Sequence, residues 1–424
     1  MLTKRKIGDF VRIKHGFPFL GEHFTNEGKY IVLTPGNFFE AGGFKHTPGK
    51  EKYYDADFPE EYLCSEGDLI VAMTQQAEGL LGSTAIVPES GTFLHNQRIG
   101  LISWNETLSE KMYIYYLFMT DLVRQQIRRT ASGSKVKHTS PERIYDVAVW
   151  IPDDIKIQKR ISRTLENIDH KVSLNKAIIA ELENTAKLLY DYWFTQFEFP
   201  DENGKPYRSS GGAMEYNAQL KREIPKGWTH GALSDIAYII MGQSPKGISY
   251  NTEGDGMIFF QGCTDFGHRF PTSRVYTNKP SRIAEQGDIL LSVRAPVGKT
   301  NIAYEKCCVG RGLSALRSKI GANAYLNQVI QGVSERLNTM SGNGTTFGAV
   351  TKEMLYELPV CKPEVSVIKA YEDKVAPMDR LIFKYEMQTR ELTALRDFLL
   401  PLLMNGQVTV ATAESVEEQL TLNR

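Results

Sequence analysis

An internal repeat restricts the fold of this 424-residue chain more than any other feature of its sequence. The segment at residues 7–16, Ile-Gly-Asp-Phe-x-x-Ile-x-x-Gly, recurs at residues 233–242 as Leu-Ser-Asp-Ile-x-x-Ile-x-x-Gly. Further along, the Gly-Asp segment at residues 67–71 recurs at residues 287–291. The matches keep their order while their offset drifts by a few residues, as insertions in surface loops would cause. We therefore favour two copies of one unit over chance similarity among Gly-Asp turns.

Each copy is expected to be a mixed α/β unit. Short apolar runs lie between glycine-rich turns, a pattern typical of strands, and one longer segment in each copy is expected to be a helix. The expected strands include residues 69–73, 84–87, 289–293 and 301–304, and the expected helices are residues 112–129 and 324–340.

Each copy then ends in a long segment whose apolar residues follow a heptad repeat. In the first segment, a seam from Leu165 to Trp193 advances in alternating steps of three and four residues. Neither glycine nor proline interrupts residues 155–197. The second seam, from Val375 to Leu403, has the same phase. Because such seams are typical of helices that pack on one another, we favour mutual packing over two amphipathic helices on separate cores.

Four polar or irregular residues modify these seams. A buried Asn175 would cost stability while fixing the register of the helices. Thr389 and Arg396 are weak positions in the second seam, and Pro377 is expected to kink its helix or delay the start. If a two-fold axis relates the units, the helices pack antiparallel, in a rod of roughly 50 Å at about 1.5 Å per residue. The predicted fold is therefore mixed α/β with long helices: two globular units in a pseudo-two-fold arrangement, separated by an antiparallel two-helix coiled coil.

The domain boundaries follow from this pattern and from a segment rich in Pro, Gly, Asn and Ser, which is typical of a linker. The expected order is a first globular domain at residues 1–154, a central long helix at 155–198, a linker at 199–225, a second globular domain at 226–364, a C-terminal long helix at 365–407 and a tail at 408–424.

The composition excludes several protein classes. No apolar run is long enough to span a membrane, the first residues lack the apolar stretch of a secretory signal, and the five cysteines form no C-x-x-C pair. We expect a cytoplasmic protein without a membrane association, a disulfide framework or a zinc site. Since 50 Lys and Arg balance 50 Asp and Glu, the net charge gives no nucleic-acid signal, although a local basic face would suffice for binding.

Catalytic motifs are absent from the sequence. The Gly-Lys-Thr triplet at residues 298–300 lacks the first glycine of a phosphate-binding loop, because Val293 stands in its place. There is no Asn/Asp-Pro-Pro-aromatic loop of an adenine methyltransferase, no His-Glu-x-x-His motif and no nucleophile elbow. Asp153 and Asp154 resemble part of a nuclease site, but at a helix entry we expect both to be N-caps. We expect no catalytic residue, no metal ligand and no cofactor in this chain.

Local basic clusters remain as candidates for function. Lys and Arg beside glycines and hydroxyl groups suit close approach to phosphates, whereas a solvated charged face is the alternative. The clusters comprise Arg124, Arg128, Arg129, Lys135, Lys137 and His138 in the first unit, and Arg282, Arg294, Lys299, Lys306, Arg311, Arg317 and Lys319 in the second.

Three motifs point to a known family. Residues 192–207 read Tyr-Trp-Phe-x-x-Phe-Glu-Phe-Pro-x-x-Asn-Gly-Lys-Pro-Tyr, residues 224–228 read Ile-Pro-x-Gly-Trp, and residues 399–406 read Leu-Leu-Pro-x-Leu-Met-x-Gly. With the paired Gly-Asp segments, they make the chain resemble the specificity (S) subunit of Type I restriction–modification systems over nearly its whole length. The resemblance implies two target recognition domains, binding of double-stranded DNA, no catalytic centre, and assembly with two modification subunits and with restriction subunits.

The resemblance also implies a mechanism. Two different heads on a rigid spacer should recognise a bipartite, asymmetric DNA sequence, and the modification subunits would bring S-adenosylmethionine and methylate an adenine in each half-site. Two alternatives stay open: an enzyme with its own catalysis, and a structural protein whose heads bind other proteins. For contact with bases or phosphates we select polar residues beside glycine turns at matching positions of the repeat. They are Gln75, Arg98, Lys135, Lys137 and His138 in the first unit, and Gln243, Arg294, Lys299, Arg311 and Thr345 in the second.

Overall fold

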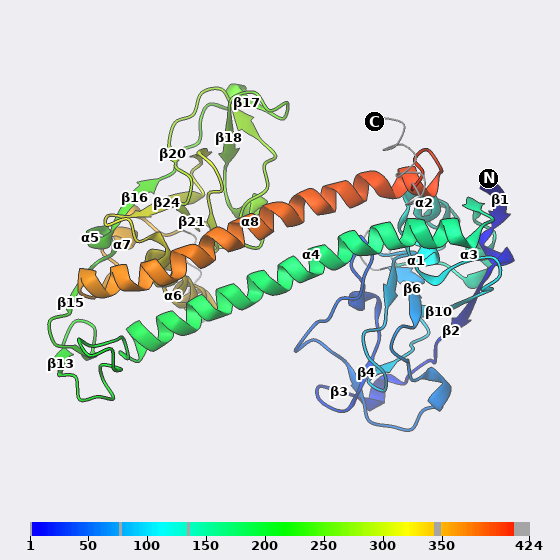
Figure 1. Ribbon diagram of the computed structural model, residues 1–424, viewed down its shortest axis with the longest axis horizontal. Coiled ribbons are helices and arrows are strands. Elements are labelled where there is room, and N and C mark those ends of the chain that lie inside the picture. The colour runs from blue at the N-terminus through cyan, green and yellow to red at the C-terminus, as the bar shows by residue number, and fades with distance from the viewer. Residues whose placement is uncertain (1, 76–78, 134–135, 343–348, 411–424) are drawn as a thin grey trace, which may run out of the picture. The chain divides into compact units, whose positions relative to one another are not determined.

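The chain forms two compact units of mixed α/β structure (Figure 1). The computed structural model describes residues 2–75, 79–133, 136–342 and 349–410. Unit 1 comprises Met1–Leu174 and Thr389–Arg424, and unit 2 comprises Asn175–Gln388. Two long helices, α4 (Ile155–Tyr190) and α8 (Val365–Met404), contribute residues to both units. Among the helices that the structure describes, none has the length and apolarity required to cross a membrane.

Unit 1 is built on a four-stranded antiparallel sheet. Its strand order is β2-β10-β6-β8, and a smaller sheet of order β3-β5-β4-β9 contains one parallel pair, β4 with β9. The first strand, β1 (Leu2–Lys6), pairs antiparallel with β12 (Ala148–Pro152), the last strand before α4. The remaining strands of the two sheets are β2 (Val11–His15), β10 (Ile99–Trp104), β6 (Leu69–Ala72), β8 (Thr84–Ile86), β3 (Phe24–Thr25), β5 (Tyr53–Tyr54), β4 (Tyr30–Val32) and β9 (Phe93–Leu94).

Unit 2 repeats this topology. Its main sheet has the order β16-β24-β21-β22, and its second sheet, β17-β19-β18-β23-β20, again contains one parallel pair, β18 with β23. β15 (Thr229–Ala232) pairs with β25 (Pro359–Lys362) before α8, as β1 pairs with β12 before α4. The equivalent strand orders confirm the predicted internal repeat. The strands are β16 (Ala237–Met241), β24 (Leu313–Ser318), β21 (Ile289–Ser292), β22 (Thr300–Ile302), β17 (Tyr250–Asn251), β19 (Tyr276–Thr277), β18 (Met257–Phe260), β23 (Cys307–Val309) and β20 (Ile283–Ala284).

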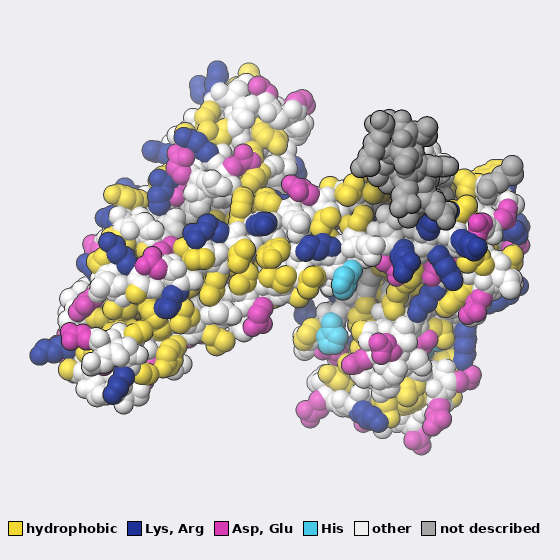
Figure 2. All heavy atoms as spheres, viewed as in Figure 1, with side chains coloured by type: hydrophobic (Ala, Val, Ile, Leu, Met, Phe, Trp, Pro, Cys, Tyr) yellow, Lys and Arg dark blue, Asp and Glu magenta, His cyan; other side chains and the backbone are white. Residues whose placement is uncertain are grey.

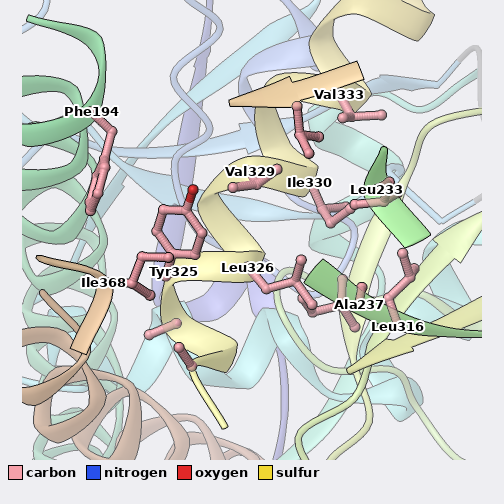
Figure 3. Close-up of a cluster of buried hydrophobic side chains, with 14 of the residues drawn as sticks. Phe194, Leu233, Ala237, Leu316, Tyr325, Leu326, Val329, Ile330, Val333 and Ile368 are labelled. Carbon is pink, nitrogen blue, oxygen red and sulfur yellow. The ribbon is translucent and has the colours of Figure 1, made fainter. Parts of the chain in front are cut away.

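The core of unit 2 surrounds helix α6 (Asn323–Gly342), as Figure 3 shows. Tyr325 points toward Phe194 in the π-helical turn η5 (Asp191–Thr195), and their ring centroids are 4.9 Å apart. Leu326 and Ile330 point the other way, toward Leu316 of β24. Leu326 and Ile330 are four residues apart and therefore lie on the same face of α6. That face packs on the sheet, while Tyr325 packs on the turn that follows α4.

The corresponding region of unit 1 differs from the prediction of one helix at residues 112–129. It forms two helices, α1 (Lys111–Met119) and α2 (Asp121–Thr130), separated by Thr120. Thr120 has an extended backbone, and its hydroxyl donates to the carbonyl of Leu117 at 2.7 Å. This local hydrogen bond competes with helix continuation, because threonine satisfies a carbonyl of the preceding turn with its own side chain.

The long helices pack against each other within unit 2. Tyr371 Oη donates to the carbonyl of Ala186 at 2.9 Å, and Asn175 Nδ2 donates to Gln388 Oε1 at 3.0 Å. Because the later residue of α4, Ala186, contacts the earlier residue of α8, Tyr371, the two helices run antiparallel. The side chain of Asn175 is fully buried, so the prediction of a buried polar residue in the seam is confirmed.

In unit 1 the two helices also pack antiparallel, and of the two weak seam positions Arg396 is paired, whereas the buried hydroxyl of Thr389 has no hydrogen-bond partner among the described residues. Arg396, expected to be a weak position, donates from Nη1 to Asp169 Oδ1 at 2.9 Å. Tyr116 Oη donates to the second oxygen of the same carboxylate at 2.7 Å. The predicted delay at Pro377 is wrong, because α8 begins at Val365 and passes through the proline. A proline removes one backbone hydrogen bond of the helix, and buried seam residues such as Val375 stabilise the helix despite this loss.

Candidate nucleic-acid interface

In unit 1 the candidate residues meet at one end of the main sheet. β6 continues into β7 (Thr74–Gln75), which pairs with β11 (Lys137–His138) so that Gln75 lies opposite Lys137. Arg98 directly precedes β10, and its carbonyl accepts a hydrogen bond from the amide of Met73 at 3.0 Å. Four of the five candidates therefore converge, although they are far apart in sequence. The fifth, Lys135, lies outside the described residues.

These four side chains are not equally available to a ligand. Arg98, Lys137 and His138 are exposed, and His138 Nδ1 lies 3.0 Å from the hydroxyl of Thr74. Gln75 is buried, and its Oε1 accepts a hydrogen bond from the amide of Leu81 at 3.0 Å. The Gln75 side chain thus holds the end of the following loop, while the three exposed side chains remain oriented toward solvent.

In unit 2 the candidates gather at the equivalent end of the equivalent sheet. Gln243 follows β16, and Arg311 precedes β24 with its amide donating to Ser244 Oγ at 3.3 Å. Arg294 follows β21 and Lys299 precedes β22. All four of these side chains are exposed. Thr345 lies outside the described residues.

At each of these sheet ends, the last glycine of the repeated motif lies against the loop that leads into β10 or β24. A Cβ added to Gly16 would lie 2.2 Å from the backbone of Asn96, and a Cβ added to Gly242 would lie 2.1 Å from the carbonyl oxygen of Gly310. Any side chain at either position would push the first strand away from the loop that leads into β10 or β24. The two glycines therefore fix the position of the loops that carry Arg98 and Arg311.

Two basic residues of the predicted clusters have structural roles. Arg124 is only 5% exposed, and its guanidinium donates to the carbonyls of Phe118 at 3.2 Å and Gly79 at 3.1 Å. Burial lowers the pKa of Arg124 to about 10, and the positive charge of Arg128 adds to this effect. Arg317 binds the buried carboxylate of Asp288 through Nε at 2.6 Å and Nη2 at 2.7 Å. Arg124 is therefore committed to the fold and not available to a phosphate, whereas the side chain of Arg317 is 40% exposed although it is ion-paired with Asp288.

One basic residue that the candidate set omits lies at the interface. The hydroxyl of Ser281 donates to the carbonyl of Gln243, which places the exposed Arg282 beside the end of β16. The amide of Val309 donates to the carbonyl of Arg282 at 2.9 Å and fixes this position. The sequence signal was the basic stretch itself, but only the pairing of distant strands brings Arg282 next to Gln243.

Asp153 and Asp154, at the start of α4, have different roles. Asp154 Oδ1 accepts a hydrogen bond from the amide of Lys156 at 2.8 Å, as expected for an N-cap. The same expectation for Asp153 is wrong, since its carboxylate accepts hydrogen bonds from Thr3 and, at 2.7 Å, from Arg5. The hydrogen bond from Thr3, followed by that from Arg5, holds the pKa of Asp153 below its usual range. Within the described ranges, no three His, Cys, Asp or Glu side chains gather as metal ligands.

Comparisons with known proteins agree with this architecture. Residues 2–184 match the family model of the Type I restriction modification DNA specificity domain. A Methanocaldococcus jannaschii protein, named as the specificity subunit of the type I restriction enzyme MjaX, is 29% identical over 362 residues, with 83% of this chain and 81% of that protein covered. The type I restriction enzyme MjaIX specificity subunit of the same organism is 23% identical over 321 residues, with coverage of 70% and 69%.

A solved structure shows the same fold. The crystal structure of the Type I restriction–modification S subunit from M. genitalium matches with a TM-score of 0.61 at 14% identity, over 95% of this chain and 96% of that chain. Specificity subunits are non-catalytic components of restriction–modification complexes, in agreement with the missing catalytic motifs in this sequence. Residues 2–184 are thus similar to the Type I restriction modification DNA specificity domain, and most of the chain is similar to specificity subunits of type I restriction enzymes.

Proposed function

We propose that this chain recognises a bipartite, asymmetric DNA sequence, with one half-site for each unit. The observation that carries this proposal is an exposed arginine just before equivalent strands in the two units, Arg98 immediately before β10 and Arg311 two residues before β24. The side chains at matching positions differ, since the strand registers place Gln243 where unit 1 has Phe17 and Arg311 where unit 1 has Gln97. Equal backbones with unequal side chains favour two different half-sites.

The physical basis is contact with base edges and phosphates. An arginine that donates two hydrogen bonds to a guanine discriminates against other bases by about 1–3 kcal/mol. Several such contacts are needed in each unit to define a half-site, while lysines such as Lys137 and Lys299 contribute phosphate contacts without sequence information. Helices α4 and α8 continue from one unit into the other, and in this proposal their length sets the unread gap between the half-sites.

The long helices also provide surfaces for protein partners in this proposal. Figure 2 shows hydrophobic side chains along them, and the exposed fraction of one, Phe398, is 66%. Exposed apolar residues along a helix favour a protein partner over continuous contact with water. We assign these surfaces to two modification subunits, which would carry S-adenosylmethionine and take up the flipped adenine of each half-site; restriction subunits would join for cleavage. The exposed residues are Leu174, Leu188, Leu381, Leu395 and Phe398.

The test uses the chain assembled with its modification subunits. Arg98→Ala is expected to relax discrimination at one half-site only, and Arg311→Ala at the other, each by about 1–3 kcal/mol or roughly 5- to 150-fold. Methylated adenines would be mapped on a library of duplexes, with binding measured at several salt concentrations. Arg208→Ala removes an arginine of the linker that is also exposed, and serves as the control.

Three outcomes would contradict the proposal. A loss of affinity that is uniform over all DNA sequences would show that Arg98 and Arg311 contact phosphates and do not read bases. No binding of any duplex by the assembled complex would favour the heads as protein-binding modules. Methylation or cleavage by the purified chain alone would make it an enzyme.

A further inference from the structure

One apolar side chain beside the candidate interface of unit 2 is almost fully exposed. Ile248 lies in the short 3₁₀ turn η6 (Gly247–Ser249), and it is 92% exposed, more than any other large apolar residue in the described ranges. Single apolar residues are common on protein surfaces and need no explanation by themselves. The surroundings of Ile248 therefore decide whether it has a role.

Three hydrogen bonds fix the turn that carries Ile248. The amide of Ser249 donates to the carbonyl of Lys246 at 2.9 Å, and the amide of Asn278 donates to the carbonyl of Ser249 at 3.3 Å. The buried hydroxyl of Ser249 lies 2.8 Å from that of Thr277 in β19. Because the backbone on both sides of Ile248 is held, contact with a ligand costs little conformational entropy at this position.

The same turn occurs in unit 1 with different exposed side chains. The amide of His23 donates to the carbonyl of Leu20 at 3.2 Å and closes η2 (Gly21–His23), as the equivalent bond closes η6. Counted from the registers of β2 and β16, Glu22 stands at the position of Ile248. A turn whose backbone recurs while its exposed side chains differ suits a contact that distinguishes two half-sites.

Exposed cations flank Ile248 in unit 2. Lys246 directly precedes η6, and Arg282 lies beside the end of β16. The amide of Arg311 donates at 3.3 Å to the hydroxyl of Ser244, which is four residues before Ile248. All three cationic side chains are exposed, and none forms an ion pair within the part of the chain that the structure describes.

The acidic residues that follow Ile248 along the chain have other partners. Glu253 Oε2 accepts a hydrogen bond from the amide of Thr252 at 2.9 Å, and Asp255 Oδ2 accepts one from Asn278 Nδ2 at 3.5 Å. Among the described residues, neither carboxylate forms an ion pair with the three cations. The surface around Ile248 thus keeps its positive charge and suits a polyanion.

Double-stranded DNA offers both a polyanionic backbone and an apolar group. In the proposed function Arg311 reads a base in the major groove, where the 5-methyl group of thymine is the apolar group on display. From Ser244 to Ile248 the chain spans at most about 14 Å, which is about four base-pair steps of about 3.4 Å. Ile248 is therefore within reach of the same stretch of the groove.

We propose that Ile248 contacts the 5-methyl group of a thymine in the half-site of unit 2 and selects thymine there, an assignment that rests on the proposed function. The contact adds an apolar criterion to the hydrogen bonds of Arg311, and it distinguishes thymine from cytosine, which lacks the methyl group. Burial of one methyl group corresponds to about fourfold in the dissociation constant.

Deoxyuridine tests the contact, because it keeps the hydrogen-bonding edge of thymidine and lacks only the methyl group. The chain is assembled with its modification subunits, and the half-site of unit 2 is identified as the one that Arg311→Ala relaxes. Each thymine of this half-site, in either strand, is then replaced in turn by deoxyuridine, and the Kd of each duplex is measured. One replacement is expected to weaken binding by the native chain about fourfold, whereas Ile248→Ala should bind that duplex and the thymine duplex equally.

Ile320→Ala is the matched control. It removes the same atoms from another exposed isoleucine of unit 2, in the turn that follows β24, whereas Arg311 precedes this strand. At about 3.4 Å per residue, the six residues of β24 separate the two sites by about 20 Å. Ile320→Ala should therefore keep the fourfold preference for thymine. An unchanged melting temperature would confirm that Ile248→Ala folds normally, as expected for so exposed a side chain.

The outcomes separate this assignment from the proposed function. If Arg98→Ala and Arg311→Ala each relax one half-site but no deoxyuridine replacement affects the native chain, the thymine contact is wrong and the proposed function stands. A preference for thymine that Ile248→Ala retains, or an equal loss of affinity for both duplexes with this variant, would also overturn the contact. If the two arginine variants relax neither half-site, the proposed function is wrong and the assignment falls with it.

Discussion

Replacing Asn175 with leucine is expected to raise the melting temperature of unit 2. Asn175 is fully buried, and although its Nδ2 donates to Gln388 at 3.0 Å, its Oδ1 has no partner among the described residues. Removing an unsatisfied buried carbonyl gains about 1–3 kcal/mol, and burying a leucine side chain gains about 1.5–3 kcal/mol. The lost hydrogen bond costs about 0.5–1.5 kcal/mol and the larger side chain costs about 1–3 kcal/mol in packing strain.

The balance is a gain of about 1–2 kcal/mol, or a rise of about 2–8 °C for a unit of this size. Differential scanning calorimetry of the full chain would measure it, with two controls. Asn175→Ala, which removes the amide without adding volume, should change the melting temperature less. Asn175→Asp, which keeps the shape but buries a charge, should lower it. A fall with Asn175→Leu would refute the reasoning, since it would show that the amide is satisfied or that the seam has no room for leucine.

Three further outcomes follow from the structure. Arg396→Leu should destabilise unit 1 by about 1.5–3 kcal/mol in thermal unfolding, because it strips a partner from Asp169; adding Asp169→Leu should restore most of the loss, and no recovery would exclude the ion pair as the cause. Burial lowers the pKa of His95 to about 4 in the folded protein, whereas the pKa of the same side chain is about 6.5 in the unfolded chain. The free energy of unfolding therefore falls as the pH falls from about 6.5 to about 4. At about pH 5 the free energy of unfolding is lower by about 2 kcal/mol for this reason. His95→Gln should therefore reduce, by that amount, the difference between the free energies of unfolding measured in urea at about pH 7.5 and about pH 5. An unchanged difference would contradict the assignment. Removing one heptad from each of α4 and α8 keeps the seam in phase and shortens the helices by about 10 Å, so the mapped half-sites should move about three base pairs closer. An unchanged gap would refute the role of the helices as a spacer.

The regular elements of the fold were predictable from local patterns. The seam residue Ile179 is buried as the heptad phase requires, and β6 and β21 begin at Leu69 and Ile289, as expected from the apolar runs. The break at Thr120 was not predictable, because a threonine between two apolar helical stretches is compatible with one helix or two. The strand orders were also beyond the sequence, since pairing of distant strands leaves no local pattern.

The candidate site was predictable in position more than in role. The repeat led to Arg98 and Arg311, and the structure places both just before equivalent strands but one position out of register, because the amide of Met73 donates to the carbonyl of Arg98 whereas the amide of Val293 donates to the carbonyl of Gly312. The sequence could not show that Arg124 is buried or that the Gln75 side chain accepts a hydrogen bond from the amide of Leu81, because exposure and hydrogen bonding depend on segments far away in the chain. Composition alone counts a buried structural arginine and an exposed arginine as the same basic signal.

The two units share the contacts that fix the backbone and differ in the side chains that face solvent. Tyr145 Oη accepts a hydrogen bond from the amide of Ile13 at 2.8 Å, and its counterpart Tyr356 donates to the carbonyl of Ile239 at 2.9 Å. Such contacts tie the short helix before α4 or α8 to the first strand of each main sheet and position the strand ends. Because the backbone at these ends is fixed independently of the exposed residues, those residues can differ between the units without loss of stability. A duplicated framework with unlike surfaces therefore favours two different half-sites over a palindrome, and exchanging the exposed residues between units should exchange the half-sites.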